Sequence, residues 1–124
     1  MEEAFRNLPG VLSTLVGYTG GTTDRPTYED VCTGLTGHAE AVQITFDSDG
    51  ISYRDLLKIF WEIHDPTQHN RQGPDIGSQY RSAIFFHNRE QKRDAEGSLR
   101  SLTATGKYRK HIVTQITPAE TFWC

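Results

Sequence analysis

Residues 39–46 read Ala39-Glu40-Ala41-Val42-Gln43-Ile44-Thr45-Phe46, an alternation with the period of two that is typical of a half-buried β-strand. The even-numbered positions share one face, and three of those four residues are hydrophobic. Glu40 has the same parity, so we expect a carboxyl group beside the apolar core. Desolvation would raise its pKa above the free value of about 4.3 and make it a proton donor at neutral pH. The alternative is a glutamate at the sheet edge that bends to solvent or pairs with Arg71 or Arg81.

Helices and strands are expected on both sides of this strand. Residues 11–18 predict a strand that runs into a Gly-Gly turn, and residues 52–64 predict an amphipathic helix that begins with a capping box of Ser52 and Asp55. The other expected elements are a short helix over 2–8, a capped helix from Thr27 through Cys32, a strand over 80–86, a helix from Asn88 to about Thr105 and a strand over 111–117. Together they predict helices packed on a mixed sheet in a single domain over 1–124.

A polar stretch, residues 65–79, separates the amphipathic helix from the next strand. Structureless connections of this length are uncommon in compact domains, and those that exist are usually functional. We therefore expect part of a functional site in this loop.

Composition excludes several classes of protein. The net charge is −3, and the basic residues near the end of the chain alternate with acidic ones, which does not favour a nucleic-acid partner. No apolar run approaches the roughly 20 residues of a membrane span, and the start of the chain does not resemble a signal peptide. We expect a cytoplasmic protein without a membrane segment. Five scattered histidines and two cysteines, Cys32 and Cys124, predict neither a metal site nor a disulfide scaffold, and no cofactor is expected.

Four polar side chains are candidates for chemistry: Tyr28, Glu40, Asp75 and Tyr80. They stand at expected strand ends, beside a short helix or in the long loop, where active sites are commonly built. Two phenol hydroxyls and a neutral carboxylic acid are donors that could meet one oxygen atom and stabilise developing negative charge on it. The alternative for each tyrosine alone is a ring at the edge of the core with a satisfied hydroxyl.

Five segments of the chain, in order, carry a resemblance to a known family. They are Val16-Gly17-Tyr18-Thr19-Gly20-Gly21, Pro26-Thr27-Tyr28-Glu29-Asp30-Val31-Cys32, Gly37-His38-Ala39-Glu40-Ala41-Val42, Phe60-Trp61-Glu62-Ile63-His64-Asp65-Pro66-Thr67-Gln68 and Arg71-Gln72-Gly73-Pro74-Asp75-Ile76-Gly77-Ser78-Gln79-Tyr80-Arg81-Ser82. Together these segments resemble the peptide methionine sulfoxide reductases of the A type.

The resemblance implies an α+β fold, a two-layer α/β sandwich with a mixed, ferredoxin-like (α-β plait) sheet. It implies an enzyme that reduces the S epimer of methionine sulfoxide, free or in proteins, through a cysteine sulfenic acid, with thioredoxin or another dithiol as reductant. Glu40 matches the family's proton donor. Tyr28 and Tyr80 match its oxygen-binding tyrosines, and Asp75 matches an aspartate that orders the site.

The sequence also departs from the family pattern. The family's nucleophile lies in a Gly-Cys-Phe-Trp segment just before the helix that here begins at Glu2, and we expect the domain to be truncated at both ends. Cys32 is interpreted as a small buried side chain and Cys124 as a conceivable substitute thiol. Three hypotheses follow: part of a working reductase, a non-catalytic relative that binds methionine sulfoxide or a partner, and a remnant with an exposed sheet edge.

Overall fold

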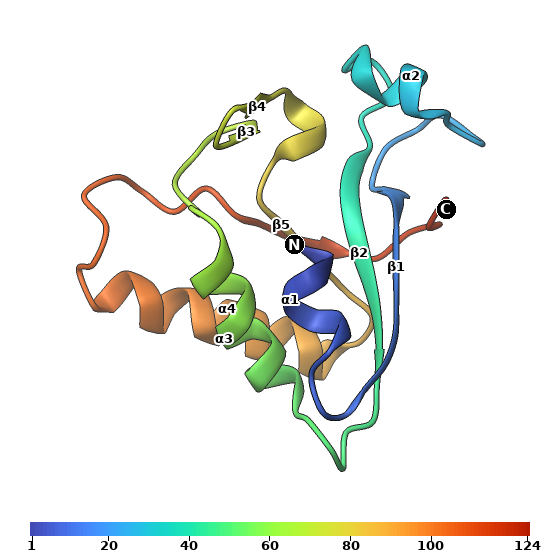
Figure 1. The fold of residues 1–124 in the computed structure, drawn as a ribbon. Helices are drawn as coiled ribbons and strands as arrows, with labels where there is room; N and C mark the ends of the chain where they lie inside the picture. The colour runs from blue at the N-terminus through green and yellow to red at the C-terminus, as the bar shows by residue number, and fades with distance from the viewer.

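The computed structural model describes residues 1–124, which form helices and strands distributed along the whole chain (Figure 1). In chain order the elements are α1 (Glu2–Arg6), β1 (Val11–Thr19), α2 (Tyr28–Cys32), β2 (Ala39–Phe46), α3 (Tyr53–Ile63), β3 (Arg71–Gln72), β4 (Asp75–Ile76), the 3-10 helix η1 (Ser78–Tyr80), β5 (Ala83–Phe86), α4 (Arg89–Ala104) and β6 (Gln115–Pro118). The expected α+β class is confirmed.

A long antiparallel hairpin forms one part of the molecule. β1 pairs with β2 from Val11 opposite Phe46 to Thr19 opposite Ala39. The strand predicted over 39–46 is confirmed at both ends. Its even-numbered hydrophobic residues are partly buried, whereas Gln43 and Thr45 are exposed, as the alternation predicted.

The hydrophobic core lies where α3 and α4 pack against β5 and β6. Its buried centre consists of Leu57 and Trp61 from α3, Ile84 from β5 and Ala95 from α4. The indole N–H of Trp61 donates to Ser98 Oγ at 3.0 Å, so the one polar group of this large side chain is satisfied. β5 and β6 are parallel, and α4 makes the crossover that parallel neighbours require.

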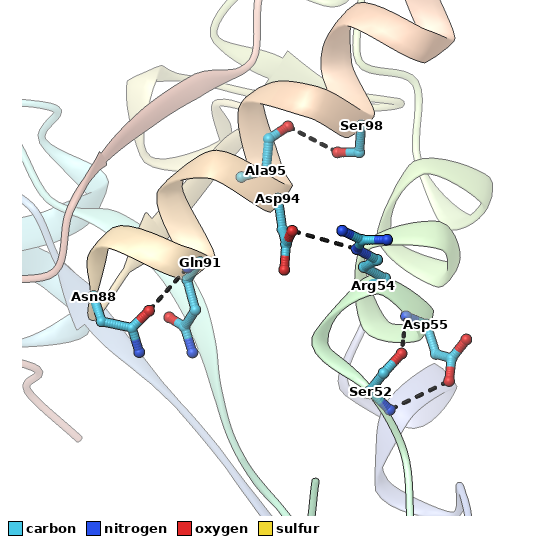
Figure 2. A network of polar contacts seen from close by, with 8 residues as sticks. All are labelled: Ser52, Arg54, Asp55, Asn88, Gln91, Asp94, Ala95 and Ser98. Carbon is cyan, nitrogen blue, oxygen red and sulfur yellow. Dashed lines mark hydrogen bonds and ion pairs between the residues drawn. The ribbon is translucent and has the colours of Figure 1, made fainter.

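Side-chain caps fix where α3 and α4 begin (Figure 2). Ser52 Oγ accepts from the N–H of Asp55, and the Asp55 carboxylate accepts from the N–H of Ser52. Asn88 Oδ1 accepts from the N–H of Gln91 in the same way. Each such cap stabilises a helix by about 1 kcal/mol, and the sequence had predicted the Ser52–Asp55 capping box and a helix that begins at Asn88.

The region between α3 and β5 differs from the prediction. Residues 65–79 are not a structureless loop, because they contain the small β3–β4 hairpin and most of η1. Tyr80 is the last residue of η1 rather than the first residue of a strand, and β5 begins only at Ala83. A β-strand requires an extended backbone that is hydrogen-bonded to a neighbouring strand. Residues 78–80 form a 3-10 turn instead, so they cannot pair in this way.

The last strand is also shorter than predicted. β6 begins at Gln115, since β5 offers only four residues to pair with, and it includes Pro118. Upstream, the N–H of Val113 instead donates to Pro66 O at 2.9 Å. The predicted initial helix over 2–8 likewise ends earlier, at Arg6.

Hydrogen bonding divides the strands into three two-stranded sheets, β1–β2, β3–β4 and β5–β6. The single mixed sheet that the sequence predicted is therefore not formed by the strands of residues 1–124. The C-terminal segment adds one isolated bridge, because Trp123 exchanges backbone hydrogen bonds of 2.7 and 2.8 Å with Tyr18. None of the helices has the length and apolar character needed to cross a membrane.

Candidate functional site

The four candidate residues come from four separate elements. Tyr28 is the first residue of α2, Glu40 is the second residue of β2, Asp75 begins β4 and Tyr80 ends η1. Their electrostatic influence on Tyr80 connects them in the folded chain: burial raises the pKa of Tyr80, the charges of Asp75 and Glu40 raise it further, and the side chain of Tyr28 lowers it. The structure thus brings the four residues together.

The centre of this arrangement is the pair of phenols with a thiol beside them. Tyr28 and Cys32 are four residues apart on α2 and share one face of the helix. Side-chain hydrogen bonding with Cys32, together with the charge that this thiol carries when ionised, raises the pKa of Tyr28 to about 12. Tyr28 is 63% exposed, so its hydroxyl is open to a ligand from solvent.

Tyr18 is a fifth polar group that the sequence had not indicated. The hairpin register places it directly opposite Glu40, so the two side chains lie on the same face of the sheet at the distance of a cross-strand pair. Burial raises the pKa of the Tyr18 hydroxyl, and the charges of Glu40, Cys32 and Tyr80 raise it further. Only the pairing register could have revealed this neighbour.

The predicted burial of Glu40 beside the apolar core is not observed. Its side chain is exposed, although the hydrophobic residues of the same parity are partly buried. The prediction from strand parity was wrong about burial: Glu40 stands at the start of the strand and is exposed there, although residues of the same parity further along are partly buried. Two tyrosines, Tyr18 and Tyr80, are its neighbours instead of the apolar core.

Arg81 holds η1 against the start of β2. Its guanidinium donates to Gly37 O, to Ser78 O and to Gln115 Oε1, at 2.9, 2.9 and 3.1 Å. The first of these bonds ties the residue after Tyr80 to the segment just before Glu40. Arg81 is therefore a positioning residue for the tyrosine, a role that the sequence did not assign to it.

The turn before α2 is fixed by His38, which is 3% exposed. Its Nδ1 accepts from the N–H of Gly21 at 3.0 Å, and its Nε2 donates to Thr23 O at 2.7 Å. A Cβ at Gly21 would stand 2.3 Å from the backbone nitrogen of His38, so only glycine allows the two backbone segments to lie this close together. The glycine pair is turn chemistry, as predicted, and it directs the chain from β1 toward the tyrosines.

Both cysteines are free and exposed. The interpretation of Cys32 as a buried side chain was wrong, since α2 projects it from the surface beside Tyr28. Cys124 follows Trp123, whose backbone pairs with Tyr18. The thiol whose charge raises the pKa values of Tyr18, Tyr28 and Tyr80 is, however, that of Cys32. No group of three or more His, Cys, Asp and Glu side chains is placed to hold a metal ion.

The polar cluster stands at the rim of a cavity of about 530 Å³ that is lined mainly by hydrophobic residues. Glu40, Asp75 and Tyr80 all line it. Hydroxyl and carboxyl groups at the rim of an apolar cavity can donate to a polar oxygen while the rest of a ligand, or of the protein, contacts hydrocarbon. Such a site is suited to stabilising negative charge on a single oxygen.

Comparison of the sequence with known proteins finds one family and relatives that share its name. The sequence profile of the family described as peptide methionine sulfoxide reductase matches residues 1–124. The chain is 61% identical over 123 residues to "Peptide methionine sulfoxide reductase MsrA" of Methanothermobacter thermautotrophicus and 58% identical to the protein of the same name from Methanoculleus marisnigri. These alignments cover 99% of this chain and 73% and 75% of the two relatives.

Two solved structures have a similar fold. The chain matches methionine sulfoxide reductase A of Corynebacterium diphtheriae with a TM-score of 0.84 and 38% identity, over 98% of this chain and 62% of that one. It matches Mxr1 from Saccharomyces cerevisiae in its reduced form with a TM-score of 0.83 and 34% identity, over 92% of this chain and 65% of that one. The chain thus spans less than two thirds of each solved structure.

Proposed function

The chain belongs to the peptide methionine sulfoxide reductase family, and on that premise we propose that residues 1–124 supply the half of a reductase site that binds the sulfoxide oxygen and protonates it. The substrate is the S epimer of methionine sulfoxide, free or within a peptide or protein. The observation that carries the proposal is the convergence of Glu40, Asp75 and Tyr80, from three separate elements, at one cavity, with Tyr28 of a fourth element next to Tyr80.

The reaction moves one oxygen atom and two electrons. A cysteine thiol attacks the sulfoxide sulfur, the S–O bond breaks, and the oxygen is transferred to the cysteine, which gives methionine and a cysteine sulfenic acid. A dithiol of the thioredoxin type then reduces the sulfenic acid, which yields the free thiol, a disulfide and water. The attacking thiol of the family's Gly-Cys-Phe-Trp pattern is not found in residues 1–124.

Each candidate residue has a distinct task in this proposal. The hydroxyls of Tyr28 and Tyr80 donate to the sulfoxide oxygen, whose negative charge grows as the sulfur is attacked. Their pKa values are raised, so both phenols keep their protons at neutral pH. Glu40, in its acid form, gives the proton that the oxygen acquires. Asp75 lies beside Tyr80 and orients its hydroxyl.

Three finer features belong to the same proposal. We expect the strands to take the two-layer arrangement of a ferredoxin-like plait, the reductant to be thioredoxin or another dithiol, and the site of action to be the cytoplasm. A non-catalytic protein that binds methionine sulfoxide is the second candidate, and the exposure of Tyr28, Glu40 and Cys32 to solvent favours it.

Calorimetric titration of the chain with the S and R epimers of methionine sulfoxide tests whether the site binds the substrate. We expect the S epimer to bind more tightly, and we expect the preference to shrink in a Tyr28→Phe, Tyr80→Phe double variant. Glu40→Gln should keep most of the affinity because an amide still hydrogen-bonds the oxygen. Equal affinity for both epimers in the unmodified chain would contradict the assignment of the site.

Turnover with dithiothreitol separates the two candidates. We expect no methionine from residues 1–124 alone, since they contain no Gly-Cys-Phe-Trp segment, and a catalytic signal once such a thiol is supplied. Methionine formation by the unmodified chain that disappears in Cys32→Ser, but persists in the matched control Cys124→Ser, would instead make Cys32 the attacking group. In an active form, Glu40→Gln should lower kcat at neutral pH while KM changes little.

A further inference from the structure

A series of three hydrogen bonds runs through His64, and the candidate site described above does not use it. His64 Nδ1 lies 2.6 Å from Phe60 O, and His64 Nε2 lies 2.7 Å from Ser82 Oγ. Ser82 Oγ lies 2.7 Å from Thr114 Oγ1. His64 directly follows α3, Ser82 directly precedes β5 and Thr114 directly precedes β6. These three bonds, the His64 network, therefore join three segments that are far apart in the sequence.

The donor and acceptor of each bond in the His64 network follow from the chemistry of the groups. A carbonyl oxygen only accepts, so Nδ1 carries a proton and donates to Phe60 O. Burial lowers the pKa of His64, so the imidazole is neutral at pH 7 and its Nε2 carries no proton. Nε2 therefore accepts from the Ser82 hydroxyl, and the Ser82 oxygen accepts from the Thr114 hydroxyl. A single tautomer of His64 satisfies every group of the network.

Packing fixes the plane of the imidazole as well. Its ring centroid lies 4.2 Å from that of Phe60 and 6.3 Å from that of Trp61, and the imidazole and indole planes meet at 21°. Trp61 is a buried residue of the hydrophobic core. The last carbonyl groups of a helix have no partner within it, so the bond to Phe60 O also stabilises the end of α3. His64 is thus held by the core, and its Nε2 is a fixed point for Ser82.

Ser82 connects this fixed point to the candidate site. It is 5% exposed, and it stands two residues after Tyr80, the last residue of η1. Its carbonyl oxygen accepts from the N–H of Gln115 at 3.0 Å, so both its side chain and its backbone are hydrogen-bonded. His64, Tyr80 and Ser82 all line the same cavity. A residue fixed in this way restricts the positions that Tyr80 can take.

We propose that His64 is a positioning residue for Tyr80: by accepting from Ser82 it holds the end of η1 where the Tyr80 hydroxyl meets the sulfoxide oxygen. This inference rests on the proposed function, which gives Tyr80 that oxygen as its ligand. His64 itself does not touch the substrate. Arg81 bonds the same segment to Gly37, before β2, whereas His64 bonds it to the end of α3. The two anchors attach the segment to different elements, so loss of either one lets the phenol move.

Two substitutions of His64 retain different halves of the imidazole. Asparagine places an amide near the position of Nδ1, so His64→Asn keeps a donor for Phe60 O and loses the bond to Ser82. Glutamine places its amide near the position of Nε2, so His64→Gln keeps an acceptor for Ser82 and loses the bond to Phe60 O. Each variant lacks one hydrogen bond, so the two should lose similar stability, but only His64→Asn releases Ser82.

Calorimetric titration with the S epimer of methionine sulfoxide measures the consequence. We expect His64→Asn to weaken binding by roughly five- to tenfold, the effect of one hydrogen bond, and His64→Gln to weaken it by less than about twofold. In the background of Tyr80→Phe, His64→Asn should have no further effect on affinity, because its influence is exerted through the Tyr80 hydroxyl. A role in stability alone would not produce this dependence on Tyr80.

Two further variants provide the controls. Thr114→Val removes the outer end of the His64 network and keeps the bond between His64 and Ser82, so it should lower Tm without changing the affinity. Ser82→Ala breaks that bond from its other end and should weaken binding as His64→Asn does, which tests the proposal even if His64→Asn does not fold. Equal losses of affinity in Thr114→Val and Ser82→Ala would assign the effect to stability and overturn the proposal.

Nuclear magnetic resonance tests the same inference without any sulfoxide. In the unmodified chain at pH 7, the ring nitrogens of His64 should show a protonated Nδ1 and an unprotonated Nε2. The opposite tautomer would contradict the hydrogen bonds on which the proposal rests. The ring resonances of Tyr80 should move in His64→Asn and in Ser82→Ala, and they should stay in place in His64→Gln.

The two readouts distinguish failure of this inference from failure of the proposed function. If the Tyr80 resonances move in these variants while the unmodified chain binds both epimers equally, the positioning role is supported and the sulfoxide site is contradicted. If the preference for the S epimer survives in His64→Asn and the Tyr80 resonances stay in place, the sulfoxide site is supported and the positioning role is overturned.

Discussion

Replacing Arg81 by lysine tests whether one side chain holds the candidate site together. The guanidinium makes three hydrogen bonds, to a carbonyl before β2, to a carbonyl of η1 and to Gln115 in β6. These acceptors lie in different directions, which suits a planar fork. An ammonium keeps the charge but is a single point on a flexible stem, so Arg81→Lys loses at least two of the three bonds.

The size of the effect follows from those bonds. A hydrogen bond at a partly exposed site contributes about 1 kcal/mol net, so Arg81→Lys should lower the free energy of unfolding by about 2 kcal/mol. For a domain of this size, about 1 kcal/mol corresponds to roughly 4 °C, and Tm should fall by about 8 °C. The affinity for the S sulfoxide should fall as well, because Tyr80 is no longer held beside Glu40.

Denaturant unfolding followed by circular dichroism measures the first effect, and the slope with denaturant concentration should stay unchanged. Arg71→Lys is the matched control, because the exposed Arg71 donates only to Gly73 O, and it should cost less than about 0.5 kcal/mol. If Arg81→Lys were as stable as the control, or were destabilised with the epimer preference intact, Arg81 would not be the group that positions Tyr80.

Three further predictions concern other parts of the molecule. Burial lowers the pKa of His64, so below about pH 6.5 the unfolded chain takes up a proton that the folded chain binds more weakly. Stability should therefore decline as the pH falls from about 6.5 through the lowered folded-state value, and unfolding curves should show that this decline is smaller in His64→Gln. Gly21→Ala should destabilise the fold by more than about 3 kcal/mol, since its Cβ would lie 2.3 Å from the backbone of residue 38. In the control Gly34→Ala, where φ is +75° and no atom lies within 4 Å of the added Cβ, the cost should be about 1 kcal/mol. A similar loss of stability in both variants would refute the explanation by close backbone approach. For Tyr80→Phe in a catalytically complete form we expect kcat/KM to fall by roughly 10–100-fold, with a comparable loss for Tyr28→Phe, and an unchanged rate in either would remove that hydroxyl from the oxygen-binding role.

Local signals in the sequence were sufficient for the elements that the chain specifies by itself. The alternation over 39–46 gave both ends of β2, and the capping residues Ser52 and Asn88 gave the starts of α3 and α4. Each of these depends on residues within a few positions of one another, where hydrogen-bond geometry and hydrophobic period are local properties. The family, and with it the four candidate residues, also followed from the linear order of motifs.

The sequence did not predict the features that depend on contacts between residues far apart along the chain. The exposure of Glu40, the position of Tyr18 opposite it and the projection of Cys32 beside Tyr28 are consequences of strand register and of which element covers which, and no single segment encodes them. The same holds for the three separate sheets in place of one: a strand's sequence predicts that it will extend, but whether its edge is paired is decided by the neighbour it meets. Local hydrogen bonds and periodicity therefore determined the pieces of this protein, and only the long-range packing of its strands decided where its polar groups converge and which edges stay open.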